Sequence, residues 1–381
     1  MKILVTGAKG FVGKNLVCEL NNRNLYHKQA NPNAAALYEI FKYDIGSTPE
    51  ELEEYTQKCD FIFHLAGVNR PKDEKEFMEG NFGFTSDLLG LLKKHKNSSP
   101  ILITSSIQAE MDNPYGKSKK AGEDLIFAYG EEVGSKVFVY RLPNLFGKWC
   151  RPNYNSAVAT FCNNIAKDLP IQVNDPSVVL SLAYIDDVLN EFVSALNDKA
   201  NKIGYFCEVP TSHRVELGKI VELLKSFRKS REDLSIPDMS DEFTKKLYST
   251  YLSYLSPDDF SYDLNMNVDN RGSFTEFIRT ADRGQVSVNI SKSGVTKGQH
   301  WHHTKNEKFL VVKGTGVIRF RHVQSKDVIE YFVNGDKLEV VDIPTGYTHN
   351  IENLGDEDMV TVMWVNECFD PENPDTYFEK V

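Results

Sequence analysis

The histidines of this chain are concentrated in its C-terminal quarter, where five of the nine occur. His300 and His302 are two residues apart, so on a β-strand both side chains point into one cavity, whereas His303 points away. Glu307 begins the next expected strand after a short turn, and His349 follows a Pro-x-Gly turn. Neutral imidazoles and a carboxylate suit a divalent transition metal. We therefore expect a metal site formed by His300, His302, Glu307 and His349.

Several metals match this set of ligands. Zinc is our first expectation, and nickel, manganese and iron stay open because the ligand types do not separate them. The alternative is a cavity without metal, in which His300 and His302 transfer protons. We expect His303 and His322 to be ordinary surface or core residues.

A tyrosine and a lysine with a spacing of four residues, Tyr115 and Lys119, lie at the start of a predicted helix. This spacing places both side chains on one face. A nearby ammonium favours the phenolate and lowers the pKa of Tyr115, which can then exchange a proton with a carbonyl or alcohol oxygen. Ser106 lies just past the end of a predicted strand and can hydrogen-bond the same oxygen.

A glycine-rich turn follows the first expected strand and opens a helix. Glycines permit the tight turn and the close approach of the backbone to a pyrophosphate, and the helix N-terminus offers amide donors and a partial positive charge. In this strand-turn-helix context the pattern is typical of a dinucleotide site. The expected contacts come from Gly7, Lys9, Gly10, Phe11, Val12 and Gly13.

The preferred coenzyme depends on the end of the second strand, which we expect at Tyr38–Phe41, followed by Lys42, Tyr43 and Asp44. Lys42 and Lys9 can meet the 2′-phosphate of NADPH, whereas Asp44 can bind the ribose hydroxyl of NADH. We favour NADPH and leave NADH as the alternative.

The first half of the chain alternates short apolar runs with amphipathic segments, which predicts a parallel sheet covered on both faces. The expected strands are 3–5, 38–41, 61–65, 101–103 and 137–140, and the expected helices are 10–22, 83–94 and 115–129. Residues 191–250 are expected to be mostly helical.

From about residue 266 the pattern changes to short strands separated by turns, which predicts an all-β sandwich or barrel. The expected strands are 274–278, 285–290, 308–312, 316–322, 329–333, 337–343 and 361–365. We place the domain boundary near residue 260, giving domains 1–260 and 261–381.

The composition narrows the function classes. The chain has 381 residues with 44 Lys and Arg against 54 Asp and Glu, a net charge of −10. This balance argues against a broad nucleic-acid or membrane surface but permits a local basic pocket for an anion. No apolar run has the length of a membrane span, and the six scattered cysteines contain no Cys-x-x-Cys pair. We expect a cytoplasmic protein with reduced thiols.

Several ordered motifs of residues 1–250 resemble the extended short-chain dehydrogenase/reductase family, most of whose members act on nucleotide sugars. The motifs are the Thr6-Gly7 to Gly13 turn, His64-Leu65-Ala66-Gly67, Asn81, Ser106, Tyr115 with Lys119, Arg141-x-Pro-Asn144-Leu-Phe-Gly147 and Tyr184-Ile-Asp-Asp187. The resemblance implies a catalytic set of Ser106, Tyr115 and Lys119. It also implies coenzyme contacts from Leu65, Ala66, Gly67, Tyr115 and Lys119.

The same resemblance implies a nucleotide-sugar pocket built partly from residues 141–187. Asn144 and Arg151 are the expected substrate contacts, and Asn153 and Asn155 are further candidates for the diphosphate or sugar. The alternative for the three loop residues is an ordinary polar loop.

The histidine-rich region resembles the two motifs of the cupin barrel, since His-x-His-x₄-Glu-x₆-Gly is followed by Pro-x-Gly-x-x-His-x-x-x-Asn. Residues 269–300 also resemble the cupin-type 3,5-epimerases of nucleotide 4-keto-sugars, which generally lack metal. This second resemblance implies that His300 is the catalytic base and that Lys297 polarises the substrate carbonyl or binds a phosphate. Lys308 and Tyr347 are candidates for the acid.

Taken together, the chain is similar to bifunctional capsule-precursor enzymes of UDP-N-acetyl-L-fucosamine biosynthesis. The predicted fold is an α/β Rossmann-type doubly wound parallel sheet followed by an all-β cupin (jelly-roll) barrel. The resemblance implies that the cupin half epimerises C3 of a UDP-2-acetamido-2,6-dideoxy-4-keto-hexose. The first half then reduces C4 with NADPH to give UDP-2-acetamido-2,6-dideoxy-L-talose.

One alternative is a reductase whose cupin half is a metal-stabilised dimerisation module. Another is a regulatory sugar-binding protein on a reductase scaffold, against which Tyr115 and Lys119 argue. We expect a homodimer or a larger assembly.

Overall fold

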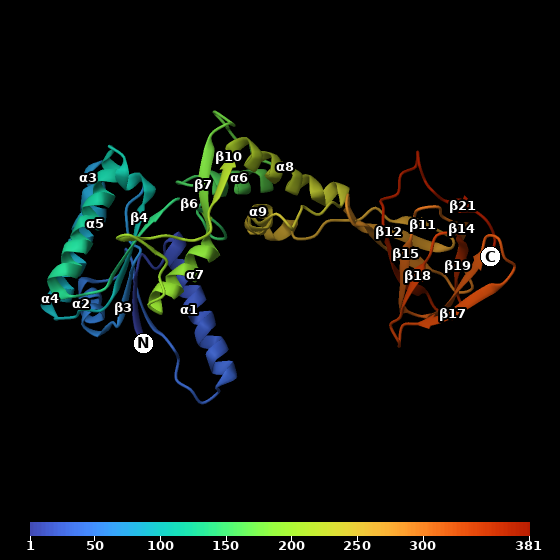
Figure 1. Cartoon of the computed structure of the whole chain (residues 1–381), viewed down its shortest axis with the longest axis horizontal. Helices are drawn as coiled ribbons and strands as arrows, with labels where there is room; N and C mark the ends of the chain where they lie inside the picture. The colour runs from blue at the N-terminus through green and yellow to red at the C-terminus, as the bar shows by residue number, and fades with distance from the viewer. The chain divides into compact units, whose positions relative to one another are not determined.

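The computed structural model describes residues 1–381, which divide into two compact units. The first comprises residues 1–225 and 241–256, and the second comprises residues 226–240 and 257–381. The units are not separated by a single cut, because residues 226–240 associate with the second unit. Figure 1 shows the helices and the parallel strands in the first unit and the short strands of the second.

The first unit is built on a seven-stranded sheet in the order β2-β1-β3-β4-β5-β9-β8. Its five leading strands pair in parallel, and the expected fold class is confirmed. These strands are β1 (Lys2–Thr6), β2 (Glu39–Tyr43), β3 (Phe61–His64), β4 (Ile101–Ser106) and β5 (Val137–Leu142). Every residue of β3 is buried, as expected for a strand covered on both faces.

Helices pack on both faces of this sheet and enclose two apolar cores. Helices α1 (Phe11–Ala30) and α7 (Ile185–Leu196) contribute to one core, and the other is lined by α2 (Pro49–Lys58), α4 (Phe84–Lys94) and α5 (Pro114–Val133). Helix α5 begins where the Asn113 side chain caps the Gly116 amide, with Pro114 in the first turn. It ends at Gly134, whose φ of 69° lies in the left-handed region.

Part of the region expected to be helical contains short strands instead. These are β8 (Lys202–Ile203), β9 (Phe206–Cys207) and β10 (His213–Glu216). The turn between β8 and β9 uses Gly204 at a φ of 62°, which favours glycine. Strand β10 joins β6 (Asn144–Phe146) and β7 (Val179–Tyr184) in a second sheet. Helices α6 (Ala157–Ala166), α8 (Leu217–Asp233) and α9 (Glu242–Leu252) complete the helical part.

The second unit consists of two sheets of short strands. One has the order β11-β12-β13-β20-β15-β18 and the other β17-β16-β19-β14-β21. The strands are β11 (Asn267–Asp269), β12 (Gly272–Thr280), β13 (Gly284–Ser291), β14 (Thr296–Trp301), β15 (Glu307–Lys313), β16 (Thr315–His322), β17 (Val328–Asn334), β18 (Val340–Ile343), β19 (Tyr347–Asn353), β20 (Met359–Val365) and β21 (Tyr377–Phe378). Side chains from both sheets, including Phe309 and Ile351, form its apolar core.

None of the helices is both long enough and apolar enough to cross a bilayer.

Candidate functional site

The glycine-rich turn between β1 and α1 has the geometry that the sequence predicts. Gly7 has a φ of 68°, and a Cβ on it would lie 2.7 Å from the Ala66 amide nitrogen. A Cβ on Gly13 would lie 2.1 Å from the Gly7 carbonyl oxygen. Neither position tolerates a side chain, because the backbone of residues 65 and 66 lies against Gly7 and the backbone of residues 7 and 8 lies against Gly13. Helix α1 begins at Phe11 with Gly10 as its N-cap. The amides of its first turn have no acceptor within the helix and can therefore bind an anion at the glycine turn.

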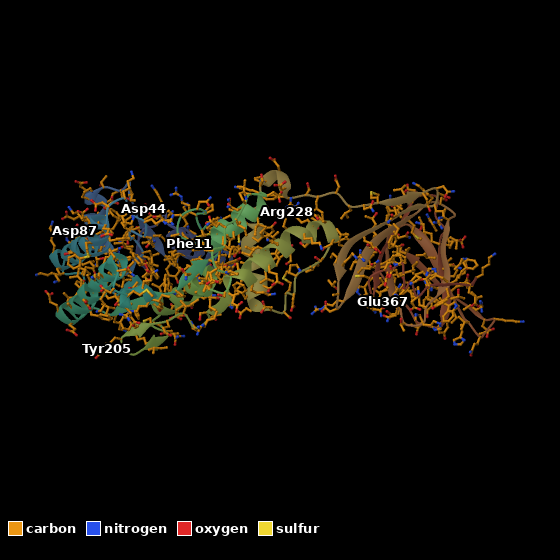
Figure 2. The ribbon with its side chains drawn as sticks, turned by 90° about the horizontal axis from the view of Figure 1, so that it is seen from above. Phe11, Asp44, Asp87, Tyr205, Arg228 and Glu367 are labelled. Carbon is orange, nitrogen blue, oxygen red and sulfur yellow. The ribbon has the colours of Figure 1, made fainter.

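The residues that bear on coenzyme preference lie beside this turn. The Asp44 carboxylate accepts hydrogen bonds from the Lys9 amide at 2.7 Å and from the Ile45 amide at 2.8 Å. Lys42 is exposed at the end of β2. Figure 2 labels Phe11 at the start of α1 and Asp44 after β2. Asp44 therefore braces the backbone of the turn, whereas the Lys42 ammonium is open to solvent.

Tyr115, Lys119 and Ser106 converge at the end of β4 and the start of α5. The ammonium of Lys119 lies 5.9 Å from the centre of the Tyr115 ring and donates to the Thr104 carbonyl at 3.2 Å. Burial raises the pKa of Tyr115, and a hydrogen bond with Ser106 opposes this rise. Burial lowers the pKa of Lys119 to about 8, against the attraction of Glu123. The expected lowering of the Tyr115 pKa is thus wrong for the free chain, since desolvation outweighs the hydrogen bond with Ser106.

A chain of buried hydrogen bonds supports this group, and the sequence motifs did not reveal it. His64 Nδ1 lies 2.8 Å from the Thr6 hydroxyl, and His64 Nε2 lies 2.8 Å from the Thr85 hydroxyl. Thr85 donates to the Asn81 carbonyl, so it must accept from Nε2–H, and Nδ1 then accepts from Thr6. The Asn81 amide group donates to Ser118, which neighbours Lys119. Both ring nitrogens of His64 are therefore satisfied.

Gly67 lies close to this network. A Cβ at residue 67 would lie 2.8 Å from the Asn81 side-chain oxygen and 3.0 Å from the Lys119 ammonium. The missing side chain leaves room for both polar groups at the turn expected to contact the coenzyme. This arrangement supports the expected grouping of residues 65–67 with Lys119.

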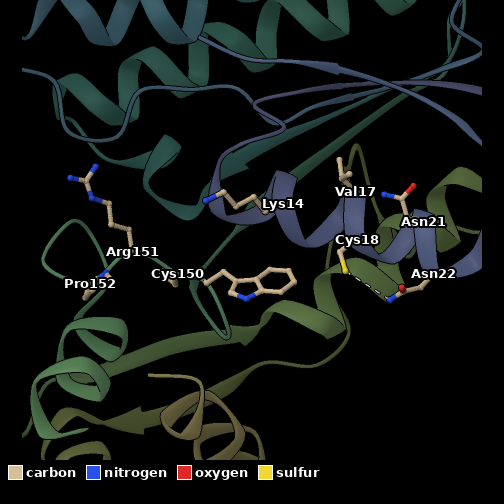
Figure 3. A pocket seen from close by; sticks show the side chains of 9 residues that line it. Lys14, Val17, Cys18, Asn21, Asn22, Cys150, Arg151 and Pro152 are labelled. Carbon is tan, nitrogen blue, oxygen red and sulfur yellow. Dashed lines mark hydrogen bonds between the residues drawn. The ribbon is translucent and has the colours of Figure 1, made fainter. Parts of the chain in front are cut away.

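The expected substrate residues of the first unit lie on its surface. Asn144 is exposed on β6, and Asn153 and Asn155 are exposed in the following loop. Arg151 stacks 5.3 Å from the Tyr154 ring centre and lines an open pocket against α1 (Figure 3). That pocket is lined by Lys14, Val17, Cys18, Asn21, Asn22, Trp149, Cys150, Arg151 and Pro152. It contains neither Tyr115 nor Lys119, so their grouping with Arg151 stays a prediction.

In the second unit the four expected metal ligands come together. His300 lies on β14, His302 follows the end of that strand at Trp301, Glu307 begins β15, and His349 lies on β19. One ligand atom of each residue lies within 4.8 Å of those of the others. A carboxylate oxygen of Glu307 lies 3.1 Å from His349 Nε2 and 3.6 Å from His302 Nε2. His302 and His349 are buried, whereas His300 is half-buried.

The cluster contains buried polar atoms that have no hydrogen-bond partner in the protein. They are His302 Nε2, Glu307 Oε2, and both ring nitrogens of His349. A buried polar atom without a hydrogen-bond partner destabilises the folded protein. Because several such atoms converge here, they indicate a bound group that accepts several lone pairs at once. Burial lowers the pKa of His300 to about 4, which keeps its imidazole neutral and able to act as a ligand or a base. These residues fit a divalent transition metal.

A β-bulge places Lys297 on the same inner face as His300. Lys297 pairs opposite Ile351 and His300 opposite His349, with Gln299 as the extra residue between them. On a regular strand, residues three apart point to opposite faces, and the extra residue removes that opposition. Gln299 has a φ of 68°, in the left-handed region. The Lys297 ammonium donates to the Asn289 side chain at 2.8 Å, and burial lowers its pKa.

The structure does not bring Lys308 to the cluster. Glu307 points inward at the start of β15, so the next side chain points outward, where Lys308 is exposed and forms an ion pair with Asp342. Tyr347 packs against the inner core two residues from His349, so it remains the better placed candidate acid.

The remaining histidines of the region lie outside the cluster. His303 is exposed and packs against Trp301 and Tyr377. His322 packs edge-on against Tyr347, and its Nδ1 accepts from the Gln324 amide at 3.1 Å.

Two family matches cover most of the chain. Residues 3–205 match the NAD dependent epimerase/dehydratase family, and residues 267–377 match the polysaccharide biosynthesis C-terminal domain. The UDP-2-acetamido-2,6-beta-L-arabino-hexul-4-ose reductase of Pseudomonas aeruginosa is 46% identical over 377 residues, which cover 99% of this chain and 98% of that protein.

Solved structures resemble the whole chain. The capsular polysaccharide assembling protein CapF from Staphylococcus aureus is 57% identical with a TM-score of 0.93, and the match covers 100% of both chains. A structure of CapF with the inhibitor 3-isopropenyl-tropolone is 52% identical with a TM-score of 0.88, again over 100% of both chains. The chain therefore belongs to the NAD dependent epimerase/dehydratase family, in the two-domain group of capsular polysaccharide enzymes that includes CapF.

Proposed function

We propose that this protein is a bifunctional nucleotide-sugar enzyme of capsule precursor synthesis. Its substrate is a UDP-2-acetamido-2,6-dideoxy-4-keto-hexose, whose C3 is epimerised in the second unit and whose C4 ketone is reduced in the first. The product is UDP-2-acetamido-2,6-dideoxy-L-talose, a precursor of UDP-N-acetyl-L-fucosamine. The full-length similarity to a reductase of a UDP-linked 4-keto sugar supports the substrate class.

NADPH is the proposed coenzyme. The glycine turn and the α1 N-terminus would hold its pyrophosphate, while the exposed Lys42 and the side chain of Lys9 would meet the 2′-phosphate. The engagement of Asp44 with two backbone amides supports this choice over NADH, because that carboxylate already braces the turn. Initial rates with the two coenzymes at equal concentration test it, and a preference for NADH would contradict it.

For the reduction, the coenzyme would supply a hydride to C4 when bound. Ser106 donates a hydrogen bond to the ketone oxygen and aligns it with Tyr115. Tyr115 transfers its phenolic proton to the same oxygen, and the Lys119 ammonium stabilises the resulting phenolate. Lys119 with a pKa of about 8 can then return a proton to Tyr115 near neutral pH.

In the second unit we propose a divalent metal, first of all zinc, held by His300, His302, Glu307 and His349. When bound, it would stabilise negative charge on a ketone oxygen. The four unpaired buried atoms support this site. CapF has been crystallised with a tropolone inhibitor, and the two adjacent oxygens of a tropolone form a pattern that chelates divalent cations.

The epimerisation requires removal of the C3 proton, which the C4 ketone acidifies, and its return to the opposite face. His300 is the candidate base, if it is not fully engaged as a ligand. Lys297 would donate a hydrogen bond to the ketone oxygen as negative charge develops there. Tyr347 is the candidate acid. Subsequent reduction of C4 draws the epimerisation equilibrium forward.

The observation that carries this proposal is that one chain contains two polar sites. The site of the first unit suits hydride transfer, and the site of the second unit suits a metal or a base. The test is an NMR product analysis in D₂O, with a UDP-linked 4-keto-6-deoxy-N-acetylhexosamine as substrate. Without NADPH, deuterium should enter at C3 while the ketone persists. With NADPH, the ketone should disappear and the L-talo product should accumulate.

The alternative is that the second unit only joins two copies of the chain. The outer face of β13 and β20 favours it, because Val288 and Val362 pair there side by side and are only half-buried. Under this alternative, active enzyme without NADPH would incorporate no deuterium at C3.

A further inference from the structure

The last residues of the chain contact the strands that carry the histidine cluster at several points. Strand β21 pairs with β14, so that Phe378 lies opposite His300. We propose that residues 375–381 act as a positioning element that fixes the ring orientation of His302 and the backbone beside His300 and His349. This inference rests on the proposed metal in the cluster.

The strongest contact orients His302 directly. His302 Nδ1 lies 2.5 Å from the Asp375 carbonyl oxygen. A carbonyl only accepts, so Nδ1 must carry the proton. In the neutral imidazole, His302 Nε2 then carries the lone pair, and this atom is buried, has no hydrogen-bond partner and lies 3.6 Å from the Glu307 carboxylate. Asp375 therefore selects the tautomer in which Nε2 offers its lone pair to the cluster.

The Asp375 side chain holds that carbonyl in place. Its carboxylate accepts from the amides of His303 at 3.0 Å, Thr304 at 2.8 Å and Lys305 at 2.9 Å, and from the Thr304 hydroxyl at 2.9 Å. This set of donors lowers the pKa of Asp375 despite the opposing effect of burial. Asp375 has a φ of 38°, a conformation that persists only where surrounding contacts fix it.

The end of the tail secures the other two histidines through their chain neighbours. The Gln299 carbonyl accepts from the Glu379 amide at 3.0 Å, and its side chain accepts from the Val381 amide at 2.9 Å. Thr348, next to His349, donates its hydroxyl to the Glu379 carbonyl. Arg321 binds the Glu379 carboxylate at 2.6 Å. Each histidine of the cluster is thus bonded to the tail or adjoins a residue that is.

Residues that orient metal ligands in this way typically change metal affinity by about 10–100-fold when they are lost. A tail that only completes the sheet would instead lower thermal stability and leave the metal environment unchanged. Metal affinity and ligand geometry therefore separate the two roles.

The experiment compares Asp375→Ala with wild type and with Asp370→Ala in the full-length protein. Asp370 is a matched control, because its carboxylate accepts hydrogen bonds from Glu372 and Asn373 of its own loop and none from the histidine cluster or its chain neighbours. Metal-free protein is titrated with Zn²⁺ against a chromophoric chelator, and a Co²⁺-loaded sample gives the visible absorption spectrum. We expect Asp375→Ala to lose about 10–100-fold in Zn²⁺ affinity with an altered Co²⁺ spectrum, and Asp370→Ala to match wild type.

Equal affinity and an identical spectrum for folded Asp375→Ala would overturn the inference. If that variant does not fold, Thr348→Val decides, because it removes a single hydroxyl and keeps the Asp375 contacts. We expect it to lose about threefold in Zn²⁺ affinity, and an unchanged value would then count against the inference. If wild type itself binds no Zn²⁺, the proposed metal site fails, and that outcome is distinct from failure of the tail alone.

Discussion

His64 in the first unit and His349 in the second unit differ in whether their ring nitrogens have hydrogen-bond partners. His64 is fully buried, and each ring nitrogen faces a threonine hydroxyl at 2.8 Å. His349 is equally buried, yet neither of its ring nitrogens has a hydrogen-bond partner, and it faces a carboxylate and two further imidazoles. The same residue type therefore serves as a structural link in one unit and as a candidate ligand in the other.

The difference shows how a binding site can be distinguished from a buried polar network that only supports the fold. Burial removes water from both histidines, so each nitrogen needs a partner. In the first unit the protein supplies every partner, and His64 fixes the backbone beside the expected coenzyme turn. In the second unit the protein supplies no hydrogen-bond partner to the nitrogens of His349, which agrees with the proposed metal site.

The largest expected effect tests whether the two units act independently. Tyr115→Phe removes the only proton that the tyrosine can transfer, so NADPH consumption should fall by about 10²–10⁴-fold. Deuterium incorporation at C3 without NADPH should stay within twofold of wild type. Stopped-flow absorbance and NMR measure the two rates on one preparation. Loss of both activities would show that the proposed division between the units is wrong.

The next prediction compares the two histidines directly. His349→Ala removes one of four metal ligands, and zinc content after purification should fall from about one ion per chain to less than 0.1, or roughly a 100-fold loss of affinity. His64→Ala should leave zinc content unchanged. It should instead destabilise the first unit by about 2 kcal/mol, because two buried threonine hydroxyls each lose one of their hydrogen bonds. Elemental analysis and denaturant unfolding measure these effects, and retained zinc in His349→Ala would contradict the proposed ligand set.

Burial of Lys119 predicts a dependence of stability on pH. Its pKa of about 8 in the folded chain lies below the ordinary value of 10.5. The unfolded state therefore binds more protons between these values, and stability rises as the pH rises from 8 to 10.5. Lys119→Met removes the free-energy cost of burying the ammonium group, so it should stabilise the first unit by about 2 kcal/mol at pH 7. The gain should vanish near pH 10.5.

Chemical unfolding at several pH values measures that difference, and Lys120→Met is the matched control. The Lys120 side chain is 45% exposed and pairs with Asp124, so its removal should change stability little at any pH. A Lys119→Met variant that is less stable than wild type at pH 7 would contradict the account of Lys119 as a desolvated ammonium.

The sequence predicted those parts of both sites whose residues are close together along the chain. The glycine turn follows from its place between a strand and a helix, the Tyr115–Lys119 and His300–His302 pairs follow from local spacing, and the structure brings the expected ligand set together. Long-range features were missed. The Asp375 carbonyl reaches His302 across 73 residues, and no local pattern indicates it. The bulge at Gln299 is equally invisible, because it is a property of strand pairing.

The smallest expected effect separates Lys308, a candidate acid of the sequence analysis, from Lys297, which was expected to polarise the carbonyl or bind a phosphate. Lys308 follows the inward-pointing Glu307 and forms an ion pair with Asp342 on the outer face, so Lys308→Ala should change C3 deuterium exchange by less than about twofold. Lys297→Met should reduce exchange about tenfold or more, because it removes a donor on the same inner face as His300. NMR in D₂O measures both rates. If Lys308→Ala were the slower variant, the inward face of β15 would not be the reactive one, and the site would have to lie outside the histidine cluster.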